Sequence, residues 1–478
     1  MKLTNFDNPV MSSWFDLKGA RLDSKPYLSG ALEARVLLEK LRVEKQPLIS
    51  LTKGYSGGIY NGPQFIRNYV ESEEHGVPFL TSGTMLLADL SRVGLLRKKD
   101  ALSPKLSYLR LEEGMTLISC SGTIGRMVYA GPYMNKVWSS QDVLKVVPDP
   151  DKILPGYLYA YLSSKFGVPQ VTEGTYGAII QHLEPIHIAK LPVPRLGAIE
   201  STVHSLCDTA AKLRNEASIK LQVASDTMNE HFEFPKKLAL SHRNFSVTTA
   251  LSNTLAYRMV GAYYIAAAQE SDQLLERNSK LDLLGDLISS VGETGRLKQL
   301  FVSEGYGVPF LTSSEIFRLQ YKPTRFIAKN LIPNSADWIV QEEDIFLARS
   351  GQVGGIIGRG VWADARFHSA CVSVDVLRLR VDRTSVLPGF LFAYLFLTDV
   401  GYRQLIRIAT GSSIPHLSLS DVLKIRVPRT TDNIEISIHE LVRDAGKLKA
   451  EAQAKEDEAR EMVETAIEEN AKWQSLSR

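Results

Sequence analysis

The 478-residue chain has few cysteines and no long apolar run. Cys120, Cys207 and Cys371 show no paired spacing, which argues against a disulfide framework or a zinc ribbon. No stretch approaches the roughly 18 apolar residues of a membrane span, and the N-terminus lacks a basic region followed by an apolar run. We therefore expect a protein of the reducing cytoplasm that is neither secreted nor inserted in a membrane.

Signatures of catalysis are also missing from the sequence. It contains no Asn-Pro-Pro-Tyr or Asp-Pro-Pro-Tyr motif of amino-methyltransferases, no GxxxxGK[ST] phosphate loop and no Gly-x-Gly-x-x-Gly after a strand. The net charge is only +3, but residues 451–469 hold eight acids against Lys455 and Arg460, so the basic excess lies elsewhere. We predict a non-catalytic chain with basic globular parts, no metal site and no cofactor of its own.

The chain does contain a long internal repeat. The heptapeptide Gly-Val-Pro-Phe-Leu-Thr-Ser occurs at 76–82 and again at 307–313. Ser-Gly-Thr-Ile-Gly at 121–125 matches Ser-Gly-Gln-Val-Gly at 350–354, and the Leu-Pro-Gly segment at 154–162 matches 387–395. A repeat of roughly 230 residues is a duplicated domain, because solenoid units are far shorter.

Each copy has a mixed pattern of strands and helices. Apolar runs at 115–120 and 344–349 predict strands that end at a glycine turn, and 125–130 and 355–358 are predicted to resume an extended conformation. Helices are predicted at 156–164 and 389–398. These patterns favour a mixed α/β fold in both halves.

Each half closes on a heptad pattern. Seam positions step alternately by three and four from 203 to 231 and from 438 to 466, and they include Leu206, Leu213 and Lys220 in the first copy and Leu441, Leu448 and Lys455 in the second. One such pattern alone also suits a monomeric surface helix. Two copies in the same register favour mutual packing, which must be antiparallel if a two-fold axis relates the halves. The 203–231 segment would then span about 42 Å, on the order of one turn of B-DNA.

The alternation of globule and long helix, the two repeated motifs and the Leu-Pro-Val-Pro exit at 191–194 resemble the specificity subunit of Type I restriction-modification systems. The resemblance covers essentially the whole chain. It implies an α+β fold with target-recognition domains at 1–198 and 241–433, followed by spacer helices at 199–240 and 434–478. The helices would pack as an antiparallel coiled coil with pseudo-two-fold symmetry. The opening at 57–63 also looks like that of such domains, whereas in the second half it is shortened to 295–298.

The resemblance implies a non-catalytic subunit that reads a bipartite, asymmetric site in double-stranded DNA and directs adenine methylation or restriction by partners. The implied partners are two DNA methyltransferase (modification) subunits, which would carry S-adenosylmethionine, and restriction/translocase subunits, in a bacterial or archaeal cytoplasm. The residues alone leave an alternative open, a duplicated scaffold that binds proteins in a phage-defence assembly. A self-contained nuclease is disfavoured by the missing motifs.

The glycine turns are the first candidates for base contacts. Close backbone approach is possible at their glycines, and the surrounding donors and acceptors are Ser121, Thr123, Arg126, Arg349, Ser350 and Gln352. Arg and Gln can make bidentate contacts to guanine and adenine, so the second turn is predicted to be the stronger reader. Tight turns of this kind also occur with no ligand.

Further DNA contacts are predicted from three other groups of residues. A loop before each exit holds Tyr176, Gln181 and His182 in the first copy and Ser412, Ser413 and His416 in the second. The end of the heptapeptide and the residues just after it supply Ser82, Thr84, Ser313 and Ser314, and isolated cations add Arg67, Arg325 and Arg366. The histidines could instead be structural, and the cations could be ordinary solvated surface residues.

Overall fold

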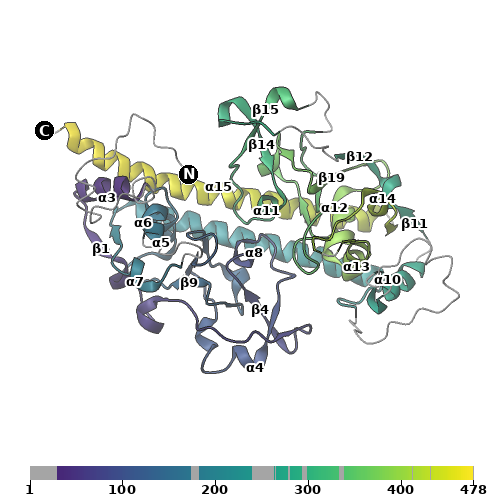
Figure 1. The fold of residues 1–478 in the computed structure, drawn as a ribbon, viewed down its shortest axis with the longest axis horizontal. Coiled ribbons are helices and arrows are strands. Elements are labelled where there is room, and N and C mark those ends of the chain that lie inside the picture. Colours follow the sequence, from purple (N-terminus) through teal and green to yellow (C-terminus); the bar gives the residue numbers. More distant parts are fainter. Residues whose placement is uncertain are drawn as a thin grey trace. The chain divides into compact units, whose positions relative to one another are not determined.

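The structure is a computed structural model. It describes residues 30–173, 182–238, 263, 265–277, 280–292, 299–332, 338–411, 413–430 and 432–476. The chain divides into two compact units: Met1–Asn215 with Glu451–Arg478, and Glu216–Ala450. Both unit boundaries fall within the longest helices, α8 (Ile199–His231) and α15 (Asp432–Leu476), each of which is one continuous ribbon (Figure 1).

The described residues of the first unit form three small sheets and several short helices. Strand β1 (Lys45–Pro47) pairs with β10 (Pro192–Pro194), and the two four-stranded sheets have the orders β2-β9-β6-β7 and β3-β5-β4-β8. Their strands are β2 (Ile59–Tyr60), β3 (Tyr69–Val70), β4 (Gly76–Leu80), β5 (Leu95–Arg97), β6 (Thr116–Ser119), β7 (Met127–Tyr129), β8 (Trp138–Ser139) and β9 (Val143–Val146). The helices are α3 (Ala31–Lys40), α4 (Lys98–Ala101), α5 (Pro155–Leu162), α6 (Gly167–Glu173) and α7 (Pro185–Ile188).

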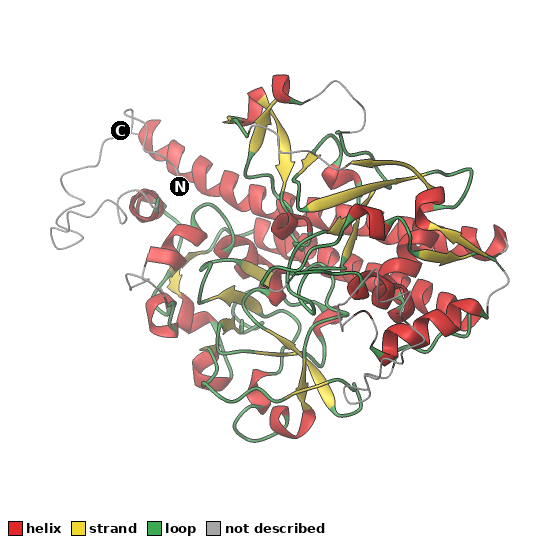
Figure 2. Cartoon of the chain, turned by 45° about the vertical axis from the view of Figure 1, so that its right-hand side comes forward, coloured by secondary structure: helices red, strands yellow, loops and turns green. Residues whose placement is uncertain are grey.

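The second unit repeats this topology strand by strand. Strand β11 (Leu281–Leu283) pairs with β20 (Arg426–Pro428), and the other sheets have the orders β12-β19-β16-β17 and β13-β15-β14-β18. Their strands are β12 (Ile288–Gly292), β13 (Phe301–Val302), β14 (Gly307–Leu311), β15 (Phe326–Ala328), β16 (Ile345–Ala348), β17 (Gly360–Trp362), β18 (Cys371–Val372) and β19 (Val376–Val381). The helices include α10 (Ala266–Glu276), α11 (Ser313–Ile316), α12 (Pro388–Phe392), α13 (Asp399–Arg407) and α14 (Leu419–Val422). The fold is therefore mixed α/β, as predicted, with strands and helices in both units (Figure 2).

The repeated heptapeptide forms the equivalent strands β4 and β14. Each pairs antiparallel with one neighbour and parallel with another, Phe79 lying opposite Trp138 and Phe310 opposite Cys371. Its glycine is required for close packing, because a Cβ at Gly76 would lie 2.7 Å from the Leu95 Cβ, and at Gly307 the same 2.7 Å from the Phe326 Cβ. The two copies thus share a packing constraint as well as an amino-acid sequence.

One predicted strand is wrong. Residues 355–358 form a turn, and the strand β17 begins only at Gly360. The backbone adopts positive φ at Gly354 (80°) and Gly358 (74°), a conformation that interrupts an extended chain. The matching segment of the first unit does become strand β7 two residues after Gly125.

The Leu-Pro-Gly segments begin helices that pack on the long helices. Helices α5 and α12 start at Pro155 and Pro388, and π-helical Ala393–Leu397 follows α12. The Gly156 amide donates to His204 Nδ1 (3.2 Å) on α8, and the Gly389 amide donates to His439 Nδ1 (3.0 Å) on α15. Glycine is needed there, because a Cβ at Gly389 would lie 2.7 Å from the His439 Cα.

Burial along the predicted helix seams alternates between buried positions and less buried ones. The seam positions that are buried as predicted are Val203, Ala210, Ala217 and Ala224 on α8 and Ile438, Ala445, Ala452 and Ala459 on α15. Between them the structure buries Cys207, Arg214, Met228, Val442, Glu456 and Val463, while Leu206, Leu213, Lys220, Leu441, Leu448 and Lys455 are only half-buried. The stripe of a surface helix is wider than a strict heptad seam, and Leu206 and Leu441 contact the globular cores from its margin. On α8, for example, the buried positions are 203, 207, 210 and 214, whereas the predicted seam ran through 203, 206, 210 and 213.

In the described part of the chain, no helix combines the length and the apolar character needed to cross a lipid bilayer.

Candidate nucleic-acid interface

The structure brings together the two loops that were predicted separately. Ser121 forms an antiparallel bridge with His182, and Ser350 forms one with His416. The same backbone bond follows in each unit: the Leu183 amide donates to the Cys120 carbonyl (3.0 Å), and the Leu417 amide to the Arg349 carbonyl (2.8 Å). Backbone pairing therefore joins each glycine turn to the histidine that follows it in space, His182 or His416.

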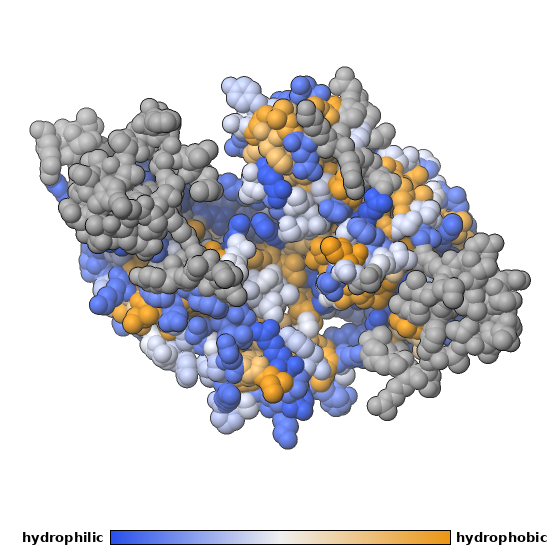
Figure 3. Space-filling model, in the orientation of Figure 1, coloured by the Kyte–Doolittle hydropathy of each residue, from blue (hydrophilic) through white to orange (hydrophobic). Residues whose placement is uncertain are grey.

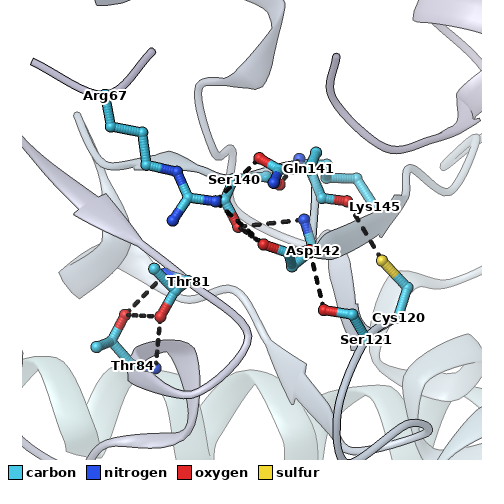
Figure 4. A network of polar contacts seen from close by, with 9 residues as sticks. All are labelled: Arg67, Thr81, Thr84, Cys120, Ser121, Ser140, Gln141, Asp142 and Lys145. Atoms are coloured by element: carbon cyan, nitrogen blue, oxygen red, sulfur yellow. Dashed lines mark hydrogen bonds and ion pairs between the residues drawn. The ribbon is translucent and has the colours of Figure 1, made fainter. Parts of the chain in front are cut away.

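An aspartate anchors the turn of the first unit (Figure 4). The Asp142 carboxylate accepts hydrogen bonds from Ser121 Oγ (2.9 Å), Ser140 Oγ (3.4 Å) and the Arg67 guanidinium (3.1 Å). The Cys120 amide donates to the Asp142 carbonyl (3.0 Å). Arg67 also donates to Gln141 Oε1 (3.0 Å), so its guanidinium is held beside the turn and lies toward the carboxylate.

Asp375 anchors the second turn in the same way. Ser350 Oγ donates to Asp375 Oδ1 (3.1 Å), and the Arg349 amide donates to the Asp375 carbonyl (3.0 Å). Ser350 Oγ also lies 2.6 Å from His416 Nδ1. Our reading of the sequence missed both aspartates, although a signal existed: Ser-x-Asp-Val-Leu occurs at 140–144 and at 373–377.

A buried cation follows each of these aspartates. Lys145 is fully buried, its Nζ donates to the Ser140 carbonyl (3.3 Å), and burial lowers the pKa of Lys145 to about 7. Its counterpart Arg378 is equally buried and pairs with Asp344 at 3.3 Å. The residue opposite each cation on the neighbouring strand also differs. Tyr60 faces Lys145 with its ring. Gly292 faces Arg378, where a Cβ would lie only 2.6 Å from the guanidinium. Lys145 thus contacts the backbone two residues before Asp142, whereas Arg378 contacts Asp344, and both side chains are buried.

Several predicted contact residues of the turns and their histidine loops are exposed: Thr123, Arg126, His182, Gln352, Ser413 and His416. Gln352 Nε2 donates to the Ser413 carbonyl (3.3 Å), which joins the second turn to its histidine loop through a side chain. Arg349 is half-buried, and its Nε donates to the Leu417 carbonyl (3.3 Å). Arg349 is therefore partly committed to holding the loop.

Other predicted contacts have structural partners. Thr84 and Thr81 exchange hydrogen bonds through their hydroxyls and amides. In the capping box of α11, the Thr312 amide donates to the Glu315 carboxylate, and the Glu315 amide donates to the Thr312 hydroxyl. Arg366 is nearly buried in a bidentate pair with Asp364. We therefore leave Thr84 and Arg366 out of the proposed interface.

The remaining candidates lie apart from the turns along the chain. Ser82 and Ser313 are half-buried, and Ser314 is exposed with its hydroxyl 3.2 Å from that of Thr312. The exposed Arg325 lies over the Phe301 ring at 5.9 Å, near β14 and β15, where apolar residues gather on the surface (Figure 3). Tyr176, Gln181 and Ser412 lie outside the described residues.

The long helices carry ion pairs within each unit. In the first unit, the Arg214 guanidinium pairs with the Glu456 carboxylate, and both are buried. In the second unit, Lys220 lies 3.7 Å from Asp444, and His231 contacts the Thr430 hydroxyl. Lys455 instead pairs with Glu458 of its own helix (3.5 Å).

The serine, histidine and aspartate of the second turn do not form a hydrolytic triad. In a triad the aspartate orients the histidine, which then takes the proton of the serine. Here Ser350 donates to Asp375, and among the described residues the His416 ring makes its hydrogen bond to the serine and not to the aspartate. The described residues also contain no cluster of three His, Cys, Asp or Glu side chains that could hold a metal ion.

No family model matches the chain, and no curated protein matches it in sequence. Solved structures similar to it include the Type I restriction-modification S subunit from M. genitalium, with 14% identity over 90% of this chain and 96% of that chain and a TM-score of 0.32. A chain from a structure on complex assembly and conformational transition of the type I R-M system has 10% identity over 90% and 97%, with a TM-score of 0.28. The HsdS subunit from Thermoanaerobacter tengcongensis has 12% identity over 90% and 93%, with a TM-score of 0.26. At these identities and TM-scores, we argue function from the contacts of this chain.

Proposed function

We propose that this chain is the non-catalytic specificity subunit of a Type I restriction-modification system or a related system, and that it reads a bipartite, asymmetric site in duplex DNA. Its domains at 1–198 and 241–433 each read one half-site. The observation that carries the proposal is the duplicated turn, in which Ser121 and Ser350 are anchored by Asp142 and Asp375 in the same way. Equivalent rigid loops suit a target that presents two related grooves.

The two turns offer different chemistry to the bases. The first presents the Thr123 hydroxyl and the Arg126 guanidinium, and the second presents the Gln352 amide with His416 and Ser413 beside it. Hydroxyl, amide and guanidinium groups read base edges in the major groove, where each base pair has its own donor and acceptor pattern. Different side chains on equivalent turns account for an asymmetric site.

The spacer consists of the helices at 199–240 and 434–478, packed as an antiparallel coiled coil with pseudo-two-fold symmetry. Two contacts of the second unit support opposite directions, because Lys220 meets Asp444 while His231, further along α8, meets the earlier residue Thr430. Within the second unit, buried alanines such as Ala224 and Ala445 allow the helices to approach closely. The spacer sets the distance between the half-sites.

The chemistry resides on partner subunits. In this proposal two modification subunits hold S-adenosylmethionine and methylate adenine, and restriction/translocase subunits join them, in a bacterial or archaeal cytoplasm. Ile219 and Val223 on α8 support a protein partner, because both are apolar, lie one helical turn apart and are exposed by 54% and 45%.

Binding of duplex DNA across a range of salt concentrations tests the proposal. Phosphate contacts release counterions, so we expect the logarithm of the affinity to fall linearly with the logarithm of salt concentration, with a slope near −0.9 for each phosphate contacted. The purified chain and its complex with modification subunits should both show this slope. Binding that is absent, or independent of salt, would contradict the proposal and favour a protein-binding scaffold.

A further inference from the structure

We infer that the pair Asp375–Ser350 fixes the tautomer of His416, so that His416 Nε2 is a hydrogen-bond acceptor that selects an amino-bearing base, adenine or cytosine, in the half-site read by the second unit. The inference rests on the proposed function and adds a residue that determines specificity.

The tautomer follows from counting protons. A serine hydroxyl has one hydrogen to donate and two lone pairs to accept with. Ser350 Oγ donates its hydrogen to Asp375 Oδ1 (3.1 Å), because an ionised carboxylate can only accept. The contact of 2.6 Å between Ser350 Oγ and His416 Nδ1 is then a bond in which Nδ1–H donates. In the neutral imidazole, the remaining nitrogen Nε2 carries a lone pair and accepts.

The ring is held on the reading surface. The backbone of His416 bridges both Ser350 and Thr410, and the Gly351 amide donates to the Pro415 carbonyl (3.2 Å). His416 is nonetheless exposed. Within the described residues, Nδ1 is its only ring atom with a recorded hydrogen bond, so Nε2 is left to meet a ligand.

An outward-facing acceptor discriminates between bases. In the major groove, adenine N6 and cytosine N4 carry donor hydrogens, whereas guanine O6 and N7 and thymine O4 are acceptors. An Nε2 lone pair therefore accepts a hydrogen bond from adenine N6 or cytosine N4, and it is repelled by the acceptors of guanine and thymine. A free histidine would exchange tautomers and lose this preference.

The described residues of the first unit do not form this arrangement. Ser121 also donates to its aspartate, but Asp142 is shared with Arg67 and Ser140. No ring hydrogen bond of His182 is recorded among the described residues, and His182 meets Ser121 through the backbone. The tautomer lock thus distinguishes the second half-site from the first.

Nitrogen NMR of the full chain labelled with ¹⁵N-histidine tests the tautomer without DNA. The His416→Ala variant identifies the signals of His416. We expect a protonated Nδ1 and an unprotonated Nε2 at neutral pH, and a mixture of tautomers in Ser350→Ala. A proton on Nε2, or on both nitrogens, in the wild-type chain would overturn the inference even if DNA binding is normal.

Competition binding with duplexes altered at single positions tests the base preference. His416→Ala should lose roughly three- to tenfold discrimination at one position of one half-site, the range expected for a single hydrogen bond. Ser350→Ala should lose part of it, and the control Ser121→Ala should leave that position unchanged. Retained discrimination in His416→Ala would overturn the inference, whereas failure of the wild-type chain to bind DNA would overturn the proposed function instead.

Discussion

The buried ion pair between Arg214 and Glu456 offers a quantitative test of how the long helices pack in the first unit. Arg214 is 5% exposed and Glu456 is fully buried. Glu456 also accepts from the Tyr159 hydroxyl (3.4 Å) and lies 3.9 Å from the Arg460 guanidinium. Arg214 makes the shortest of these contacts with the carboxylate and pairs with it directly.

Replacing one partner should therefore cost far more than replacing both. Arg214→Met leaves a buried carboxylate poorly compensated, and we expect a loss of about 3–5 kcal/mol in the stability of the first unit. Arg214→Met combined with Glu456→Leu should recover most of this loss, because an apolar pair of similar volume avoids the desolvation of two charges. The repeat supplies a precedent, since Leu221 of α8 occupies the position equivalent to Glu456.

Hydrogen exchange measured by mass spectrometry is the suitable assay, because it reports opening free energies segment by segment. Exchange should accelerate at 199–215 and 451–467 in the single variant and return toward wild type in the double variant, with 376–381 in the second unit as an internal control. A single variant that loses less than about 1 kcal/mol, or a double variant no better than the single one, would refute the reasoning.

Three other predictions concern the second unit. Gly389→Ala should lose about 1–3 kcal/mol because its Cβ would overlap the His439 Cα, measured by urea unfolding against the control Gly305→Ala, where nothing lies within 4 Å. His439 makes the stability of the fold depend on pH. Burial, with Arg443 and Arg383 nearby, lowers the pKa of His439 to about 4, below its unfolded value of about 6.5. The neutral ring therefore stabilises the fold above pH 6.5, and this contribution is lost as the pH falls through 4. In His439→Asn, the urea midpoint of unfolding should vary less with pH between pH 7 and 4. A pH dependence equal to that of the wild-type chain would count against this role. Gln352→Ala should relax recognition of one half-site by roughly three- to tenfold in competition binding, and equal effects on both halves would contradict the assignment.

The sequence predicted the architecture of each unit because the repeat identifies the same elements twice. The heptapeptide, the glycine turns and the Leu-Pro-Gly helices all recur in equivalent places. The failures have physical causes. Heptad spacing placed Leu206 and Leu441 on seams that also hold alanines, whereas tertiary contacts leave these leucines half-buried and bury Cys207 and Val442 instead. The segment 355–358, predicted as a strand, forms a turn because Gly354 and Gly358 adopt positive φ.

The site was predicted less completely than the fold. Reading local motifs found both turns and both histidines, but the aspartates that anchor the turns lie more than one strand away in sequence. Arg366 was predicted to contact DNA because of its charge, whereas its guanidinium donates two hydrogen bonds to the Asp364 carboxylate. Pairings between distant segments are set by tertiary structure, and no local pattern contains them.

The central claim is that each unit reads its own half of one bipartite site. Its most direct test is a genome-wide map of methylated adenines in cells that express this chain with the proposed modification subunits, compared with cells that express Gln352→Ala. We predict a motif of two short blocks separated by a fixed spacer, with only one block altered in the variant. A continuous motif, or a change in both blocks, would contradict the account.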